Sequence, residues 1–172
     1  MVAPAFWVQI DQGARRLLPA LTTFLLILVM ILPTGLPMWG MLAPPLTLAA
    51  IYYWSLSRPG LLPPSAAFLL GLVQDLLTGG PPGSTALVLV IVQWVLRGQQ
   101  RYLANRSFPL LWAGFAPVAL GAAAIEWLVY AAYTFAIPPI ADALVRAGIG
   151  FVLFPIVAGL VLIPVHRTLA AE

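Results

Sequence analysis

Long apolar stretches dominate the chain, and charged residues interrupt them at few positions. Four windows contain no charge apart from Asp75 and Glu126: 17–57, 59–96, 107–141 and 147–166. A helix needs ~20 apolar residues to cross the ~30 Å hydrocarbon core of a bilayer. Each window holds at least one stretch that approaches this length. The pattern therefore predicts a polytopic, all-α membrane protein.

Gly/Pro clusters and charges divide these windows into six candidate helices. The predicted helices span about 17–32, 39–56, 63–77, 84–102, 109–135 and 146–165. With 172 residues, the whole chain, 1–172, is expected to form one six-transmembrane-helix bundle and a single membrane domain. Several helices are short for a span, which requires neighbouring helices, a thinner bilayer or interfacial anchors.

Arginine placement predicts the orientation of the bundle. If the N-terminus is cytoplasmic, seven of the eight basic residues face the cytoplasm, namely Arg15, Arg16, Arg58, Arg97, Arg101, Arg106 and Arg167. Only Arg146 then faces outward, one turn after Asp142. An excess of arginine in short cytoplasmic loops is typical of membrane proteins. We therefore expect both termini to be cytoplasmic.

Composition excludes several other classes of protein. Hydrophobic residues make up 62% of the chain and charged residues 8%, against roughly 25% charged residues in soluble domains. Without cysteine, the chain forms neither disulfides nor thiolate metal sites. The net charge of +3 is spread over short segments, which favours contact with anionic lipid over nucleic-acid binding.

Asp75 is the most informative polar residue, because it lies near the end of an apolar stretch that stops in a Gly/Pro cluster. An ionised carboxylate in hydrocarbon is unfavourable by several kcal/mol. Asp75 is therefore at a membrane interface, paired with another group, or protonated. One hypothesis is a polar anchor for the end of the third helix, through Arg146, a backbone donor or a partner chain. The alternative is that Asp75 is close enough to the surface to be hydrated.

Glu126 is the other acid within an apolar window. If the third and fifth helices both run from inside to outside, Asp75 and Glu126 share the outer half of the membrane. Arg146 opens the sixth helix from that side and could pair with one of them. Alternatively, Glu126 reaches the outer interface beside Trp127.

The sequence shows no pattern typical of an active site. It has no phosphate-binding Gly-rich loop, no metal-ligand spacing and no nucleophile–base pair. We therefore expect no enzyme activity, no catalytic residue, no metal and no cofactor. The nearly apolar interior and the grooves between short helices favour an interaction protein.

A motif runs through the third predicted helix and the turn after it. Its residues are Phe68, Gly71-Leu72-Val73-Gln74-Asp75-Leu76-Leu77, Gly79-Gly80-Pro81-Pro82-Gly83 and Ala86-Leu87. This order resembles the central signature of the rod shape-determining protein MreD family. Pro82 is a departure, since an apolar residue such as Leu is more usual there. Outside 63–87 the resemblance lies in size, six short spans and cytoplasmic termini.

The resemblance implies a non-enzymatic component of the bacterial inner membrane that acts in cell elongation. Members of the family associate with the bitopic protein MreC, and with it connect MreB filaments to the peptidoglycan synthase RodA and its partner transpeptidase. The implied bundle is similar in fold to substrate-binding components of energy-coupling-factor transporters. The candidate partner-binding or structural residues are Trp39, Phe68, Gly71, Asp75, Gly79, Gly80, Gly83, Glu126 and Arg146.

A small-molecule (vitamin)-binding membrane subunit of a transporter remains an alternative function. Such a site needs polar groups that converge on a pocket, and the sequence offers Asp75, Glu126, Gln74, Trp39 and a few hydroxyls. The first helix of that class usually carries an Ala-xxx-Ala motif for its coupling subunit. Here Phe24 follows four residues after Ala20, which counts against this alternative.

Overall fold

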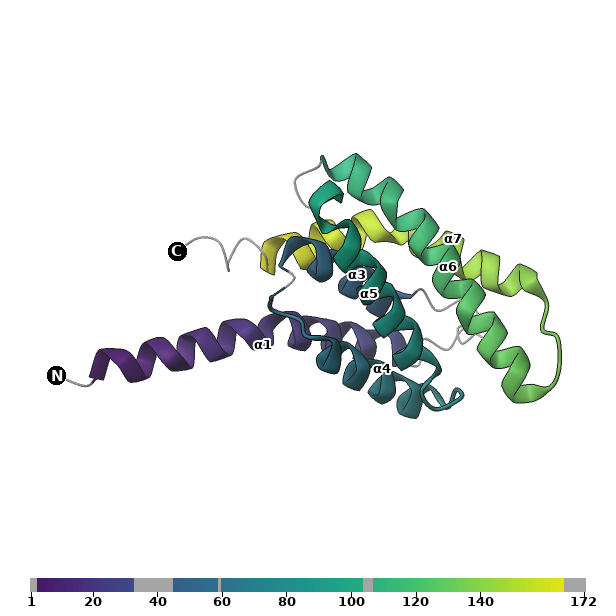
Figure 1. Cartoon of the computed structure of the whole chain (residues 1–172), viewed down its shortest axis with the longest axis horizontal. Helices are drawn as coiled ribbons and strands as arrows, with labels where there is room; N and C mark the ends of the chain where they lie inside the picture. The colour runs from purple at the N-terminus through teal and green to yellow at the C-terminus, as the bar shows by residue number, and fades with distance from the viewer. Residues whose placement is uncertain (1–2, 33–44, 59, 104–106, 166–172) are drawn as a thin grey trace.

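The computed structural model describes residues 3–32, 45–58, 60–103 and 107–165. Within these ranges the chain is helical and contains no strand, which confirms the predicted all-α class (Figure 1). The elements are α1 (Ala3–Ile31), α3 (Leu46–Ser57), α4 (Pro64–Thr78), α5 (Ser84–Leu103), α6 (Phe108–Thr134) and α7 (Ile140–Val157), which continues into the π-helical segment η1 (Ala158–Leu162).

Helix α3 lies at the centre of the bundle. Every residue from Leu46 to Leu56 is buried, and the helix contacts α1, α5, α6, α7 and η1. A helix that is apolar on all sides is typical of such a buried position. At ~1.5 Å per residue its 12 residues span only ~18 Å. The surrounding helices therefore shield it over its full length.

An aromatic cluster fixes α3 against α6 and α7. The ring of Tyr52 contacts Phe115 and Phe154 edge-on, with centroid distances of 5.2 and 5.6 Å. Phe115 and Phe154 stack on each other at 4.6 Å. The Tyr52 hydroxyl donates to the Leu111 carbonyl at 2.8 Å. A buried tyrosine needs such a partner for its O–H, so this bond makes the tyrosine compatible with the core.

At Gly71 the backbones of α4 and α5 approach each other closely. A Cβ atom at this position would overlap the backbone of Ala86, so only glycine allows this separation. Small residues at helix contacts serve the same purpose throughout membrane proteins. At the other end of the hairpin, the Gln93 side-chain amide donates to the Leu62 carbonyl at 2.7 Å. These two contacts set the distance between the helices.

Two of the described helices are long and apolar enough to cross a membrane, namely Phe108–Thr134 and Ile140–Val165. Leu17–Ile31, Pro64–Thr78 and Ser84–Gln99 are shorter apolar helices. Large apolar side chains on the two long helices are more than half exposed, for example Leu128 and Leu160. An extended exposed apolar surface is typical of contact with lipid or with a partner.

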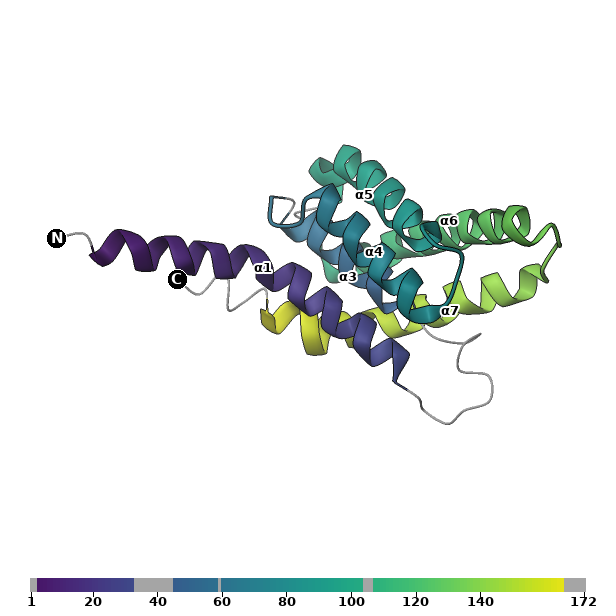
Figure 2. The ribbon, with the colours of Figure 1, turned by 90° about the horizontal axis from the view of Figure 1, so that it is seen from below.

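Three predicted helix starts differ from the structure. The first helix begins at Ala3 instead of residue 17, because Arg15 and Arg16 are good helix formers and do not end a helix. Its first half extends beyond the other helices (Figures 1 and 2). The predicted helix 39–56 corresponds to α3, which begins only at Leu46, after Pro45; residues 39–44 lie outside the described part.

The last predicted helix, 146–165, begins earlier, at Ile140. Pro139 has an extended conformation at the N-cap, and Asp142 lies in the first turn, where a negative charge complements the helix dipole. Arg146 therefore lies within α7 instead of opening it.

Gly71→Ala is expected to lower the stability of the protein. The added methyl group overlaps the backbone of Ala86, and such overpacking costs about 1–3 kcal/mol. Gly121→Ala is the matched control, since no atom lies within 4 Å of a Cβ there and alanine favours the helix by about 1 kcal/mol. Thermal unfolding in detergent compares the two, and equal melting temperatures would refute the tight contact.

Candidate functional site

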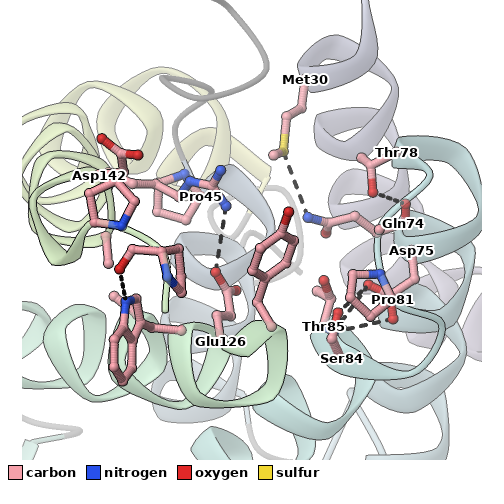
Figure 3. Close-up of a pocket in the computed structure, with 18 residues that line it drawn as sticks. Met30, Pro45, Gln74, Asp75, Thr78, Pro81, Ser84, Thr85, Glu126 and Asp142 are labelled. Carbon is pink, nitrogen blue, oxygen red and sulfur yellow. Dashed lines mark hydrogen bonds and ion pairs between the residues drawn. The ribbon is translucent and has the colours of Figure 1, made fainter. Parts of the chain in front are cut away.

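A cavity of about 500 Å³ lies at one end of the bundle, between the α4–α5 hairpin and the α6–α7 hairpin (Figure 3). The end of α1 and Pro45, just before α3, also line it. Its charged and amide-bearing lining residues are Gln74, Asp75, Glu126, Asp142 and Arg146. Elements far apart in the sequence therefore bring most of the acidic groups of the described helices to one place.

Asp75 lies in the last turn of α4 and is only 2% exposed. Its carboxylate accepts the backbone N–H of Gly83 at 2.8 Å and the N–H of Thr85 at 3.1 Å. The Ser84 hydroxyl lies 3.3 Å from it. The first N–H groups of a helix lack partners within that helix, and a negative charge at this end is favourable. Asp75 thus caps α5 from the preceding helix.

Two glycines shape the turn that makes this cap possible. Gly79 ends α4 with φ 70°, and its N–H donates to the Asp75 carbonyl at 3.0 Å. Gly83 precedes α5 with φ 89°. Glycine adopts positive φ without the steric cost that other residues incur. Pro82, the departure from the family pattern, is exposed and so leaves the cap untouched.

Glu126 on α6 and Arg146 on α7 connect the two helices of the second hairpin on one wall of the cavity. A carboxylate oxygen of Glu126 lies 3.7 Å from a guanidinium nitrogen of Arg146, and both side chains are about one-third exposed (37% for Arg146 and 32% for Glu126). A pair this long and this exposed contributes only ~0–1 kcal/mol to stability. Both side chains also line the cavity.

Gln74 presents an amide on the opposite wall of the cavity (Figure 3). The residue is 8% exposed. Its Nε2 lies 3.8 Å from the Met30 sulfur, a weak acceptor. Its Oε1 is buried and has no hydrogen-bond donor among the residues that the structure describes. A buried carbonyl oxygen without a donor is unfavourable, so this wall offers an acceptor for an incoming N–H group.

The structure brings together part of the predicted site. Asp75, Gly80, Glu126 and Arg146 line the same cavity. Asp75 was expected to interact with Arg146, a backbone donor or a partner chain, and in the structure it accepts backbone N–H groups. Arg146 forms its ion pair with Glu126. The hydration alternative for Asp75 is inconsistent with its burial.

The remaining predicted residues lie elsewhere or shape the backbone. Gly71 forms the α4–α5 contact, and Gly79 and Gly83 form the turn. Phe68 is 47% exposed on α4 and lies outside the cavity lining. Trp39 lies outside the described residues.

Several residues that line the cavity were not predicted as site residues. Thr85 and Tyr130 carry hydroxyls, and Asp142 carries a further carboxylate. Asp142 and Arg146 are four residues apart and therefore share a helix face, a spacing visible in the sequence. The sequence did not indicate that Tyr130 and Thr85 line the cavity, because isolated hydroxyl groups form no periodic pattern that assigns them to a common surface.

Fold and site define an all-α protein with membrane-length apolar helices, built on a short buried helix and a carboxylate-capped helical hairpin. The family model of the rod shape-determining protein MreD matches residues 14–163, which is most of the chain. The chain therefore belongs to the MreD family, a family of membrane proteins with a role in rod-shape determination. It is a shape-determining family and not a known enzyme family. No curated protein and no solved structure matches the chain.

Asp75→Ala is expected to destabilise the protein. The variant leaves the partly buried N–H groups of Gly83 and Thr85 without their acceptor. A fully buried donor without a partner costs about 1–3 kcal/mol, and partial access to water lowers this cost. Asp142→Ala is the matched control, because this carboxylate is exposed and its helix-dipole interaction is worth less than about 1 kcal/mol. Unfolding in detergent measures both. Loss of stability no larger in Asp75→Ala than in the control would contradict the capping role.

Proposed function

We propose that the protein is a non-enzymatic component of the bacterial inner membrane that acts in the cell-elongation machinery. In this role it binds MreC, and together they link MreB filaments to RodA and its partner transpeptidase. Membership of the MreD family carries the proposal. The exposed apolar surface of α6 and α7 supports it, since such a surface suits a protein that works in lipid and binds other membrane helices.

The proposal includes six spans with both termini in the cytoplasm. The start of α1 and the end of η1 lie at the same end of the bundle (Figures 1 and 2). Arg58 follows α3, whose start borders the cavity, and Arg97 lies ~20 Å along α5 from Ser84 at the cavity. Both arginines therefore lie at the end of the bundle that holds the start of α1 and the end of η1. By the positive-inside tendency this end faces the cytoplasm, and the cavity faces outward.

The proposed MreC contact lies beside Asp75 and the turn 79–83. This turn carries no charge, so a partner covers it without displacing water from an ion. Leu76 and Leu77 next to it are exposed. In lipid, packing depends on close fit more than on the hydrophobic effect, and a turn of Gly and Pro allows a helix to approach closely.

A small-molecule-binding subunit of a transporter is the second candidate function. The observation in its favour is the 500 Å³ cavity with converging polar groups, which has the size and character of ligand pockets. This function requires a water-soluble ligand. A tightly bound soluble compound, found by mass spectrometry of the purified protein, would favour it over the proposed role.

Gly80→Leu is expected to weaken co-purification of MreC about tenfold or more without loss of folded protein. Gly80 is exposed, and a Cβ atom added there would have no neighbour closer than 3.8 Å, so the larger side chain obstructs only a partner. Gly83 is a poor choice, since its φ of 89° makes any side chain strained. A tenfold loss corresponds to about 1.4 kcal/mol, a modest clash at an interface.

Gly98→Leu is the matched control for that experiment. Gly98 lies in the half of α5 far from the turn 79–83, and a Cβ there meets no atom within 4 Å. Loss of MreC binding in this variant, with normal binding in Gly80→Leu, would place the contact on the cytoplasmic side and refute the docking proposal.

Single cysteines test the proposed orientation, because the chain contains no other cysteine. Gly60, Gly80 and Ala141 are exposed. In intact cells with a permeabilised outer membrane, Gly80→Cys and Ala141→Cys are expected to react with a membrane-impermeant thiol reagent. Gly60→Cys is expected to react only after the inner membrane is opened. Reaction of Gly60→Cys in intact cells would overturn the orientation.

A further inference from the structure

The cavity contains charges of both signs. Glu126 and Asp142 supply carboxylates, and Arg146 supplies a guanidinium 3.7 Å from Glu126. Asp75 also lines it, but its carboxylate accepts hydrogen bonds from the start of α5. This arrangement suits a ligand that carries both a cation and an anion.

The guanidinium of Arg146 carries more donors than a single carboxylate uses. Direct charge-assisted hydrogen bonds between nitrogen and oxygen measure ~2.7–2.9 Å, whereas Glu126 and Arg146 are 3.7 Å apart. A guanidinium has five N–H donors and matches phosphate oxygens in pairs. Arg146 can therefore donate to a phosphate while it remains beside Glu126.

On the wall opposite Glu126, Gln74 carries a hydrogen-bond acceptor without a donor among the described residues. The buried Oε1 of Gln74 has no donor among the described residues, and the residue lies on the α4 side of the cavity, facing Glu126 and Asp142 on the α6–α7 side (Figure 3). A primary ammonium carries three N–H donors. It can therefore interact with a carboxylate and with an amide oxygen at once, which a quaternary ammonium cannot do.

The surroundings of the cavity suit a lipid. Trp127 and Tyr130 line it, and such aromatic side chains are enriched at the level of lipid headgroups. Ile137 and Ile140, beside the lining residues Pro138 and Pro139, are highly exposed. About 500 Å³ accommodates a headgroup, while two acyl chains would remain outside, against these exposed apolar side chains.

We propose that the cavity binds the headgroup of an aminophospholipid of the phosphatidylethanolamine type. Its phosphate accepts hydrogen bonds from Arg146, and its ammonium donates to Glu126, Asp142 and the Gln74 amide oxygen. The bound lipid fills the space between the two hairpins at their outer ends. This inference goes beyond the proposed function, because it concerns lipid binding by the chain alone and needs no partner protein.

Lipid retention tests the proposal directly. The full chain is placed in nanodiscs with equal amounts of phosphatidylethanolamine, phosphatidylcholine and phosphatidylglycerol, and is then released into mild detergent. Native mass spectrometry counts the lipids that stay bound. Wild type is expected to retain phosphatidylethanolamine about tenfold over the other two, the factor expected for one charge-assisted hydrogen bond. Equal retention of all three lipids would overturn the proposal.

Variants connect the retained lipid to the cavity. Glu126→Gln and Asp142→Asn are each expected to reduce the preference several-fold, and Gln74→Met likewise. Asp142 is exposed, so its replacement tests the site even if the other two variants unfold. Arg97→Gln is the matched control at the far end of α5, and it is expected to retain lipid as wild type does. An unchanged preference in Asp142→Asn, or an equal loss in Arg97→Gln, would refute the assignment.

Soluble glycerophosphoethanolamine distinguishes a lipid from a water-soluble ligand with the same chemistry. If the acyl chains contribute, this compound displaces the retained lipid only at large excess. Displacement at equal concentration would show that the site recognises a soluble molecule, and the lipid assignment would be wrong.

Discussion

The contact between the Asp75 carboxylate and the start of α5 is the interaction on which the rest of the structure depends. A buried carboxylate is unfavourable unless hydrogen bonds replace its water. Here the N–H groups of Gly83 and Thr85 do so. They are themselves groups that a helix start leaves without partners. One contact therefore satisfies both sets of polar groups and fixes the angle between two short helices.

This constraint extends to the cavity and to the proposed function. The capped hairpin of α4 and α5 forms one wall, and the hairpin of α6 and α7 forms the other. Both hairpins pack against the buried helix α3, the first through α5 and the second through α6 and α7. On the second side, Tyr52 of α3 contacts Phe115 and Phe154. The two hairpins meet where α5 contacts α6, and the cavity lies between them at one end of the bundle. The space between them and the uncharged turn 79–83 are the features to which we assign lipid and partner binding.

The sequence predicted what depends on local pattern and left open what depends on tertiary contact. The all-α class and the turn at Gly79 and Gly83 follow from hydrophobicity and from the conformational freedom of glycine. Pairing of Arg146 with one of the two acids was one of the alternatives that their expected depth in the membrane left open. The acceptor role of Asp75 could not be assigned, because periodicity locates a carboxylate but not the group that faces it. Gln74 was among the polar groups considered for a pocket, but its place on the wall opposite Glu126 was open. The start of α7 at Ile140 was missed, because prolines mark a break in a helix without showing at which residue the next helix begins.

Hydrogen exchange at the amides of Gly83 and Thr85 tests the central role of Asp75 most directly. The measurement compares wild type with Asp75→Ala in the same detergent, with the amide of Ile51 in the buried helix α3 as internal reference. The capping account predicts slow exchange at both amides in wild type and fast exchange in the variant, while Ile51 stays protected. Unchanged protection of Gly83 and Thr85 in the variant would contradict the account.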